Sequence, residues 1–139
     1  MKQHLSAVAL LVRDYDEAIA YYTGVLGFTL AEDTALGDGK RWVVVAPPGA
    51  VETRLILARA VTPDEIAAIG RQGGGRVWLF LQTDDFHRDH QAYTARGVKF
   101  REAPRQEAYG TVAVFEDLYG NRWDLLQPQG GGIILPAPK

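Results

Sequence analysis

The feature that most constrains the fold is a repeat in the order of the expected elements, at an offset of about 70 residues. Residues 5–58 are expected to form a strand, a helix and three strands, and residues 76–127 repeat that order. Asp14-Tyr15 corresponds to Asp85-Phe86, and Gly27-Phe28 corresponds to Gly97-Val98. One such unit cannot cover its own sheet, so the repeat predicts two modules stacked edge to edge.

The expected elements follow from apolar runs and from the capping and turn residues between them. Runs rich in branched and aromatic residues predict strands at 5–13, 28–32, 41–46, 53–58, 76–83, 98–101, 111–115 and 122–127. Asp14, Thr62 and Asp85 are typical helix N-caps, and they predict helices over 15–25, over 63–70 and from Phe86 towards Gly97. The pattern therefore belongs to the α+β class.

We expect a single domain over residues 1–139. Module one takes 1–60, a linker helix and a glycine-rich link take 61–75, module two takes 76–128, and a tail takes 129–139. A chain of this length buries enough surface to fold without disulfides or a structural metal.

Charge and composition exclude several classes of function. The 15 basic and 17 acidic residues give a net charge of −2, whereas a sequence-independent nucleic-acid binder needs a basic surplus. The chain has no cysteine, which removes disulfides, thiolate metal sites and thiol nucleophiles. No apolar run approaches the roughly 20 residues of a spanning helix, and the first residues do not form a signal peptide. We therefore expect a cytoplasmic protein without a membrane or nucleic-acid partner.

Several stretches resemble the vicinal oxygen chelate superfamily, which holds glyoxalase I, bleomycin-resistance proteins and extradiol dioxygenases. They are Val8–Asp14 with Val25-Leu26-Gly27-Phe28, Ala95–Phe100, Tyr109-Gly110 and Asp117–Gln127. The resemblance covers about residues 5–128 and implies two βαβββ modules paired into a curled mixed sheet around a cup-shaped cavity.

The same resemblance implies where a metal would bind. In metal-using members, four inward positions of the cup carry His, Gln or Glu. The corresponding positions here are Ala7, Ile56, Trp78 and Asp124. Only Asp124 offers a donor, so the sequence predicts no metal site and no cofactor.

Strand alternation extends this assignment to the lining of the cup. If the four positions face inward, the residues two places away along each strand share that face. The predicted ligand-binding residues are Ala7, Ala9, Arg54, Ile56, Trp78, Phe80 and Gln82. Small residues opposite large aromatic ones leave a slot for a flat or apolar ligand. Asp124 and Tyr109 are the candidate catalytic residues, as an acid–base pair near the mouth of the cup.

Other interpretations of these residues stay open. Trp78 and Phe80 can fill the cup as ordinary core, and Asp124 can pair with Arg54 or Arg122. His87 and His90 have a spacing that can bind metal, but their polar surroundings favour a solvated helix face.

The first hypothesis is thus a metal-free member that binds a small organic ligand. The alternative is a lyase or dioxygenase with a divalent metal on a non-standard ligand set, and a third is an interacting dimer with a filled cup. Whether the protein catalyses a reaction is left open. We also expect a homodimer, in which the helix near 63–70 and Ile133-Ile134-Leu135 are candidate contacts.

Overall fold

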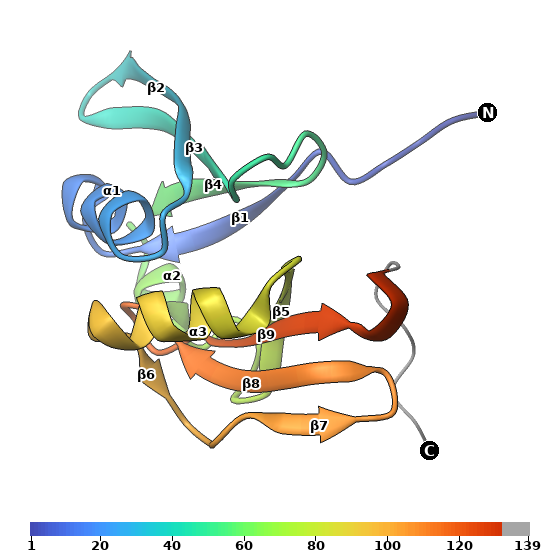
Figure 1. Ribbon diagram of the computed structural model, residues 1–139. Helices are drawn as coiled ribbons and strands as arrows, with labels where there is room; N and C mark the ends of the chain where they lie inside the picture. Colours follow the sequence, from blue (N-terminus) through green and yellow to red (C-terminus); the bar gives the residue numbers. More distant parts are fainter. Residues whose placement is uncertain (132–139) are drawn as a thin grey trace. The chain divides into compact units, whose positions relative to one another are not determined.

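A computed structural model describes residues 1–131, and its chain divides into two compact units. Unit 1 ends at Gln72 and unit 2 begins at Gly73 (Figure 1). The division falls inside the stretch 61–75 that the sequence suggests as a link. The tail contact expected from Ile133 to Leu135 lies outside the described residues.

Unit 1 contains one four-stranded mixed sheet and two helices. Its elements are β1 (Ala7–Val12), α1 (Tyr15–Gly24), β2 (Thr29–Gly37), β3 (Lys40–Ala46), β4 (Arg54–Arg59) and α2 (Pro63–Ala68). The strand order is β1-β4-β3-β2, with β1 parallel to β4 and the other pairs antiparallel. The strand expected over 28–32 is longer in the structure, because β2 continues into a hairpin with β3.

Unit 2 repeats this plan with one additional strand. Its elements are β5 (Val77–Gln82), α3 (Phe86–Ala95), β6 (Lys99–Phe100), β7 (Arg105–Glu107), β8 (Gly110–Glu116) and β9 (Arg122–Pro128), followed by a 3₁₀ turn at Gln129–Gly131. The order is β5-β9-β8-β6, and β7 also pairs with β8. The α+β prediction with two βαβββ modules is confirmed, and each sheet is open rather than closed into a barrel. β7 was not expected, because its short, charged sequence has no strand pattern.

The helices α1, α2 and α3 begin where the sequence indicates. The side chain of Asp14 accepts a hydrogen bond from the Glu17 N–H at 2.8 Å, and Asp85 accepts one from Arg88 at 3.1 Å. Thr62 and Glu65 form a complete capping box at the start of α2. These side chains satisfy backbone donors that a helix start leaves unpaired.

One face of sheet 1 packs against α1 and forms the core of unit 1. Leu10 and Val12 of β1 and Val43 and Val45 of β3 are fully buried. The backbone N–H of Arg41 donates to the hydroxyl of Tyr15 at the start of α1, which shows that this part of β3 lies beside α1. The alternating residues of each strand point away from α1, so they line the opposite face of the sheet.

Unit 2 has an aromatic core between its sheet and α3. Tyr93 of α3 meets Phe115 of β8 with ring centroids 5.6 Å apart, and Phe115 stacks on Trp123 of β9 at 5.7 Å. Gln127 of β9 accepts a hydrogen bond from the Phe86 N–H, which ties the start of α3 to the sheet. Trp123 therefore faces α3, and its neighbour Asp124 faces the other way.

The free edge of β1 is covered by a side chain. Gln72 accepts a hydrogen bond from the Leu11 N–H at 2.8 Å and donates one to the Ala9 carbonyl at 3.1 Å. These are the two groups that a neighbouring strand would use, so Gln72 satisfies part of an otherwise exposed strand edge.

Candidate functional site

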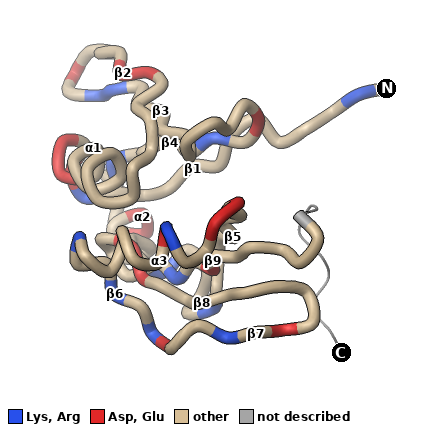
Figure 2. Tube along the Cα trace, viewed as in Figure 1, with Lys and Arg blue, Asp and Glu red and all other residues tan. Residues whose placement is uncertain are grey.

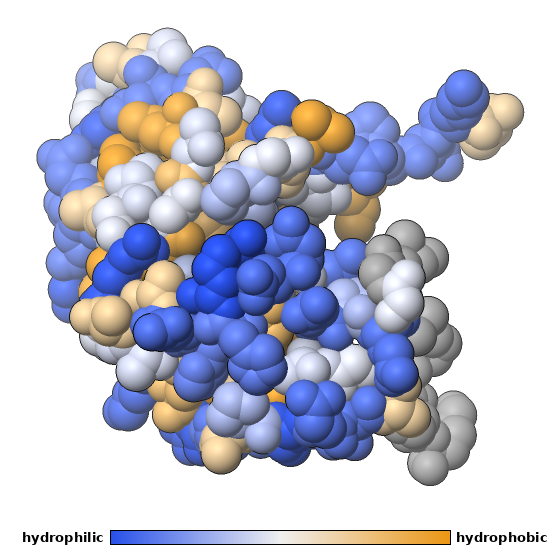
Figure 3. All heavy atoms as spheres, in the orientation of Figure 1, coloured by the Kyte–Doolittle hydropathy of each residue, from blue (hydrophilic) through white to orange (hydrophobic). Residues whose placement is uncertain are grey.

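The face of sheet 1 that points away from α1 carries an exposed aromatic side chain. We call this surface, made of Ala7, Trp42, Val44, Arg54 and Ile56, the open face. Trp42 is 40% exposed, although Val43 and Val45 beside it are fully buried. Figure 3 shows apolar atoms gathered within a largely hydrophilic surface on unit 1.

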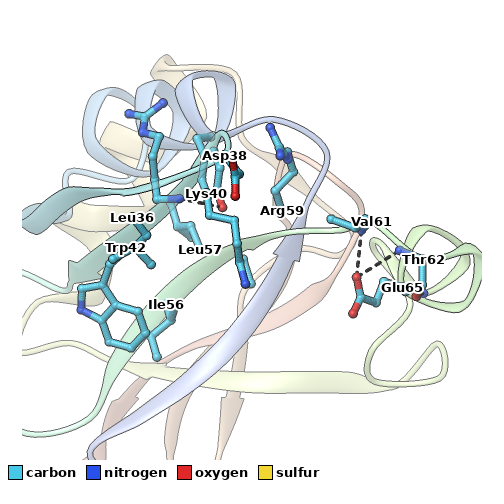
Figure 4. A pocket seen from close by; sticks show the side chains of 13 residues that line it. Leu36, Asp38, Lys40, Trp42, Ile56, Leu57, Arg59, Val61, Thr62 and Glu65 are labelled. Atoms are coloured by element: carbon cyan, nitrogen blue, oxygen red, sulfur yellow. Dashed lines mark hydrogen bonds between the residues drawn. The ribbon is translucent and has the colours of Figure 1, made fainter.

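Two hollows border Trp42 and Ile56. The first has a volume of about 670 Å³ and continues past Lys40 and Arg59 towards the start of α2 (Figure 4). The second has a volume of about 380 Å³ and reaches Ser6, Glu32 and Arg54. Ligand sites are commonly concave, mainly apolar and furnished with a few polar groups. The first hollow has this composition, whereas the wall of the second is slightly more polar than apolar.

The structure places four of the predicted ligand-binding residues in unit 1. Ala7 and Arg54 are directly opposite each other on the parallel strands β1 and β4, and Ala9 is opposite Ile56. Partners in register share a face of the sheet, so these four side chains lie on the side away from α1. Ala7, Arg54 and Ile56 all line the second hollow.

The basic side chains of the first hollow differ in their partners. Arg41 forms ion pairs with Asp33 at 2.7 Å and Asp16 at 2.9 Å, and these hydrogen bonds raise its pKa. Lys40 lies near Glu65, whose pKa is lowered first by hydrogen bonds from two backbone N–H groups and then by the Lys40 charge. Figure 2 shows acidic and basic residues interspersed along the trace rather than separated by sign.

In unit 2, Asp124 occupies the middle of β9. It pairs with Phe80 of β5 and Val114 of β8, so the three side chains share one face. Burial raises the pKa of Asp124, the positive charge of Arg105 lowers it, and the negative charge of Glu102 raises it further. One oxygen, Oδ1, is buried without a hydrogen-bond partner among the described residues.

Arg105 connects Asp124 to a wider polar cluster. Its Nε lies 3.0 Å from both carboxylate oxygens of Glu102, and its Nη1 lies 2.5 Å from Glu107. Burial lowers the pKa of Arg105, but the hydrogen bonds to Glu102, Glu107 and Tyr109 outweigh that effect and raise it. Tyr109 bonds to Arg105, and the charge of Arg105 acts on Asp124, so an arginine that sequence reasoning missed lies near both residues. Their catalytic roles stay predictions.

The sequence offered Arg54 and Arg122 as cations that could pair with Asp124. Within unit 2, the nearby cation is Arg105, whereas Arg122 donates to the Gly75 carbonyl at 2.9 Å. Arg54 belongs to unit 1, so the predicted approach of Arg54 to Asp124 joins both units and stays a prediction.

The three predicted ligand-binding residues on β5 differ in their surroundings. Phe80 is 51% exposed and stands opposite Asp124, and Gln82 stands opposite Leu126 at a small hollow of about 240 Å³. Trp78 falls at a register shift between Val77 and Leu79, and it has no partner residue on β9. The shift interrupts the strict alternation by which Trp78 was grouped with Phe80.

The implied metal positions contain an unsuitable donor set. Ala7, Ile56 and Trp78 have no side chain that binds a hard divalent ion, and Asp124 alone supplies one carboxylate. Within residues 1–131, no cluster of three or more His, Cys, Asp or Glu side chains is arranged to hold a metal. His90 instead packs against Phe86 and Phe100, with ring centroids 5.5 and 4.3 Å away.

Sequence reasoning missed Trp42 and the Glu102–Arg105 pair. Trp42 lies in the apolar run Arg41–Ala46, where strand alternation gives no contrast between the two faces. The segment of Glu102 and Arg105 was not assigned to any element. Their three-residue spacing was the available signal, but it indicates an ion pair only if the backbone brings both side chains to one side.

Comparison with known proteins identifies the family. Residues 4–125 match the family described as the Glyoxalase/Bleomycin resistance protein/Dioxygenase superfamily. The chain belongs to this superfamily. It is 56% identical over 128 residues to an uncharacterized protein of Shewanella frigidimarina (strain NCIMB 400), an alignment that covers 91% of this chain and 95% of that protein.

Solved structures of similar sequence share the architecture. TnmS3, an antibiotic binding protein from Streptomyces sp. CB03234, is 32% identical with a TM-score of 0.76, and the match covers 92% of this chain and 98% of that one. UcmS2 is 31% identical with a TM-score of 0.78, covering 91% of this chain and 98% of that one. Across residues 1–131, none of the helices has the length and apolar character required to span a membrane.

Proposed function

We propose that this protein binds a small organic molecule with an aromatic ring, without a metal ion, and that the open face of sheet 1 provides the ring's platform. The observation that carries the proposal is Trp42, a half-exposed indole between two hollows. A flat ring placed on this indole and on Ile56 removes apolar surface from water.

The comparisons support binding as the function. TnmS3 is an antibiotic binding protein, and its similarity extends over nearly the whole of both chains. Within unit 2, Phe80, Trp78 and Gln82 stay predicted ligand-binding residues, and Asp124 and Tyr109 stay predicted polar groups. The residues at the four implied metal positions support binding without a metal, because only Asp124 among Ala7, Ile56, Trp78 and Asp124 has a donor side chain. One carboxylate alone does not hold a divalent ion in place. We further propose that the protein is a cytoplasmic homodimer.

The test uses N-phenyl-1-naphthylamine, a neutral aromatic probe that fluoresces more strongly when it leaves water. The protein is first treated with EDTA and then titrated with the probe. We expect saturable binding, and we expect Trp42→Ala to weaken it about tenfold because the ring platform is removed. Trp42→Phe retains an aromatic ring and should keep most of the affinity.

A matched control is Leu118→Ala, which truncates an exposed apolar side chain of unit 2 that lines neither hollow. It should leave probe affinity unchanged. Equal binding by Trp42→Ala and the unmodified protein would exclude the open face as the platform. Binding that appears only after Mn²⁺, Fe²⁺ or Zn²⁺ is restored would support the metal-dependent alternative instead.

A further inference from the structure

We propose that the ligand of this site is an aromatic acid, and that Arg54 binds its anionic group. This inference rests on the proposed function and adds the chemical class of the ligand. The anionic group would be a carboxylate, a sulfonate or a phosphate attached to the ring system.

Arg54 is placed at the edge of an apolar wall. It lies two residues before Ile56 on β4, so both side chains project from the same face of sheet 1. Arg54 borders the hollow of about 380 Å³ that Trp42 and Val44 also line. A ring held against Trp42 and Ile56 would therefore have Arg54 at its periphery.

The guanidinium of Arg54 is available to a ligand. Within residues 1–131, Arg54 forms no ion pair or side-chain hydrogen bond, in contrast to Arg41, which is bonded to two aspartates. The one acidic residue of that hollow, Glu32, accepts a hydrogen bond from the Thr34 hydroxyl at 3.1 Å. The strongest free donor in the second hollow is thus a planar cation.

An anionic group satisfies this donor better than a neutral one. A guanidinium binds carboxylate-like groups through two parallel hydrogen bonds, and such charge-assisted bonds are stronger than neutral ones. A neutral ring system on the same surface would displace water from Arg54 without replacing its hydrogen bonds, which costs affinity. The first hollow holds two further cations, Lys40 and Arg59, beside the carboxylates of Asp38 and Glu65, so it is the competing position for an anion.

Two probes with the same rings separate the contributions. 1-Anilinonaphthalene-8-sulfonate is the sulfonated counterpart of N-phenyl-1-naphthylamine, so the ratio of their dissociation constants isolates the anionic group. We expect the unmodified protein to prefer the sulfonate. Arg54→Gln should reduce that preference about tenfold while changing the affinity for the neutral probe less than twofold.

Two further variants serve as controls. Arg71→Gln removes the same charge from unit 1 at an exposed position that lines neither hollow, and it should keep the preference. Lys40→Gln tests the other hollow and should also keep it. Circular dichroism and thermal melting of each variant establish that the probe is not reporting an unfolded state.

Each outcome has a distinct meaning. If neither probe binds the unmodified protein, the proposed function fails. If both bind but equally well, or if Arg54→Gln keeps the preference, the aromatic-acid inference is overturned while the proposed function stands. A preference lost in Lys40→Gln rather than in Arg54→Gln would also overturn it, because the anion would then lie in the first hollow.

Discussion

Asp117 is the residue whose replacement tests the construction of unit 2 most sharply. It follows β8 directly and is 6% exposed. Its Oδ1 accepts hydrogen bonds from the backbone N–H groups of Tyr119 and Asn121, and its Oδ2 accepts from the Asn121 amide and the Trp123 indole. All four donor–acceptor distances are 3.0 Å, so one carboxylate holds both the β8–β9 turn and a core tryptophan.

Asp117→Ala should lower the free energy of unfolding by about 4 kcal/mol. Each net hydrogen bond contributes on the order of 1 kcal/mol, and buried donors left without acceptors add a further cost. Asp117→Asn keeps the two bonds at Oδ1 but places an amide N–H₂ against two donors. Its cost should therefore be about half that of the alanine variant.

Equilibrium urea unfolding, followed by circular dichroism and tryptophan fluorescence, measures these differences. A double-mutant cycle with Trp123→Phe isolates the indole contact, and we expect a coupling of about 1 kcal/mol with Asp117→Asn. A loss below about 1 kcal/mol for Asp117→Ala would refute the reasoning, because the four bonds would then contribute nothing net.

Three further predictions concern other parts of the molecule. Gly110→Ala should destabilise unit 2 by about 3 kcal/mol, because the new Cβ would lie 2.1 Å from the Gln127 carbonyl oxygen. Gly74→Ala, whose Cβ would have nothing within 4 Å, should cost about 1 kcal/mol. Thermal melts compare the two variants, and equal losses of stability would contradict this prediction. The pKa of Asp124 is raised in the folded protein, so folding favours the protonated carboxyl. The stability that this protonated group contributes is fully present below pH 3.8, and it is lost as pH rises through the folded-state pKa. Asp124→Asn should therefore keep the fold and gain stability relative to the unmodified protein as pH rises above 3.8. A stability difference that does not change with pH would count against the burial of this carboxyl. Light scattering should give twice the chain mass of 15.3 kDa, and a concentration-independent mass of one chain would exclude the homodimer.

The order of the elements could be predicted from the sequence because it depends on local signals. Asp14, Thr62 and Asp85 mark helix starts through bonds to backbone groups three residues away, and the structure shows those bonds. The register shift at Trp78 could not be predicted in the same way. A bulge depends on the pairing with β9, which lies more than 40 residues later in the chain.

The candidate site was harder to predict from the sequence than the fold, for a related reason. Ala7, Arg54 and Ile56 could be assigned to one face because β1 and β4 pair in parallel without a break in register. Trp42 could not be assigned in the same way, because the apolar residues that follow it in β3, Val43 to Ala46, are buried on both faces and give no alternating pattern. Arg105 could not be predicted because it lies on β7, a strand too short and too charged to be recognised from the sequence.

The most direct test of the account is the response of the tryptophan side chains to an aromatic ligand in the absence of metal. The chain has three tryptophans, so a ¹⁵N-labelled sample in EDTA gives three indole N–H signals that can be assigned by substitution. On titration with 1-anilinonaphthalene-8-sulfonate, we predict that the Trp42 signal shifts progressively and saturates, while that of the buried Trp123 changes little. A saturable shift elsewhere with an unmoved Trp42 signal would contradict the proposal that the open face of sheet 1 binds the ring.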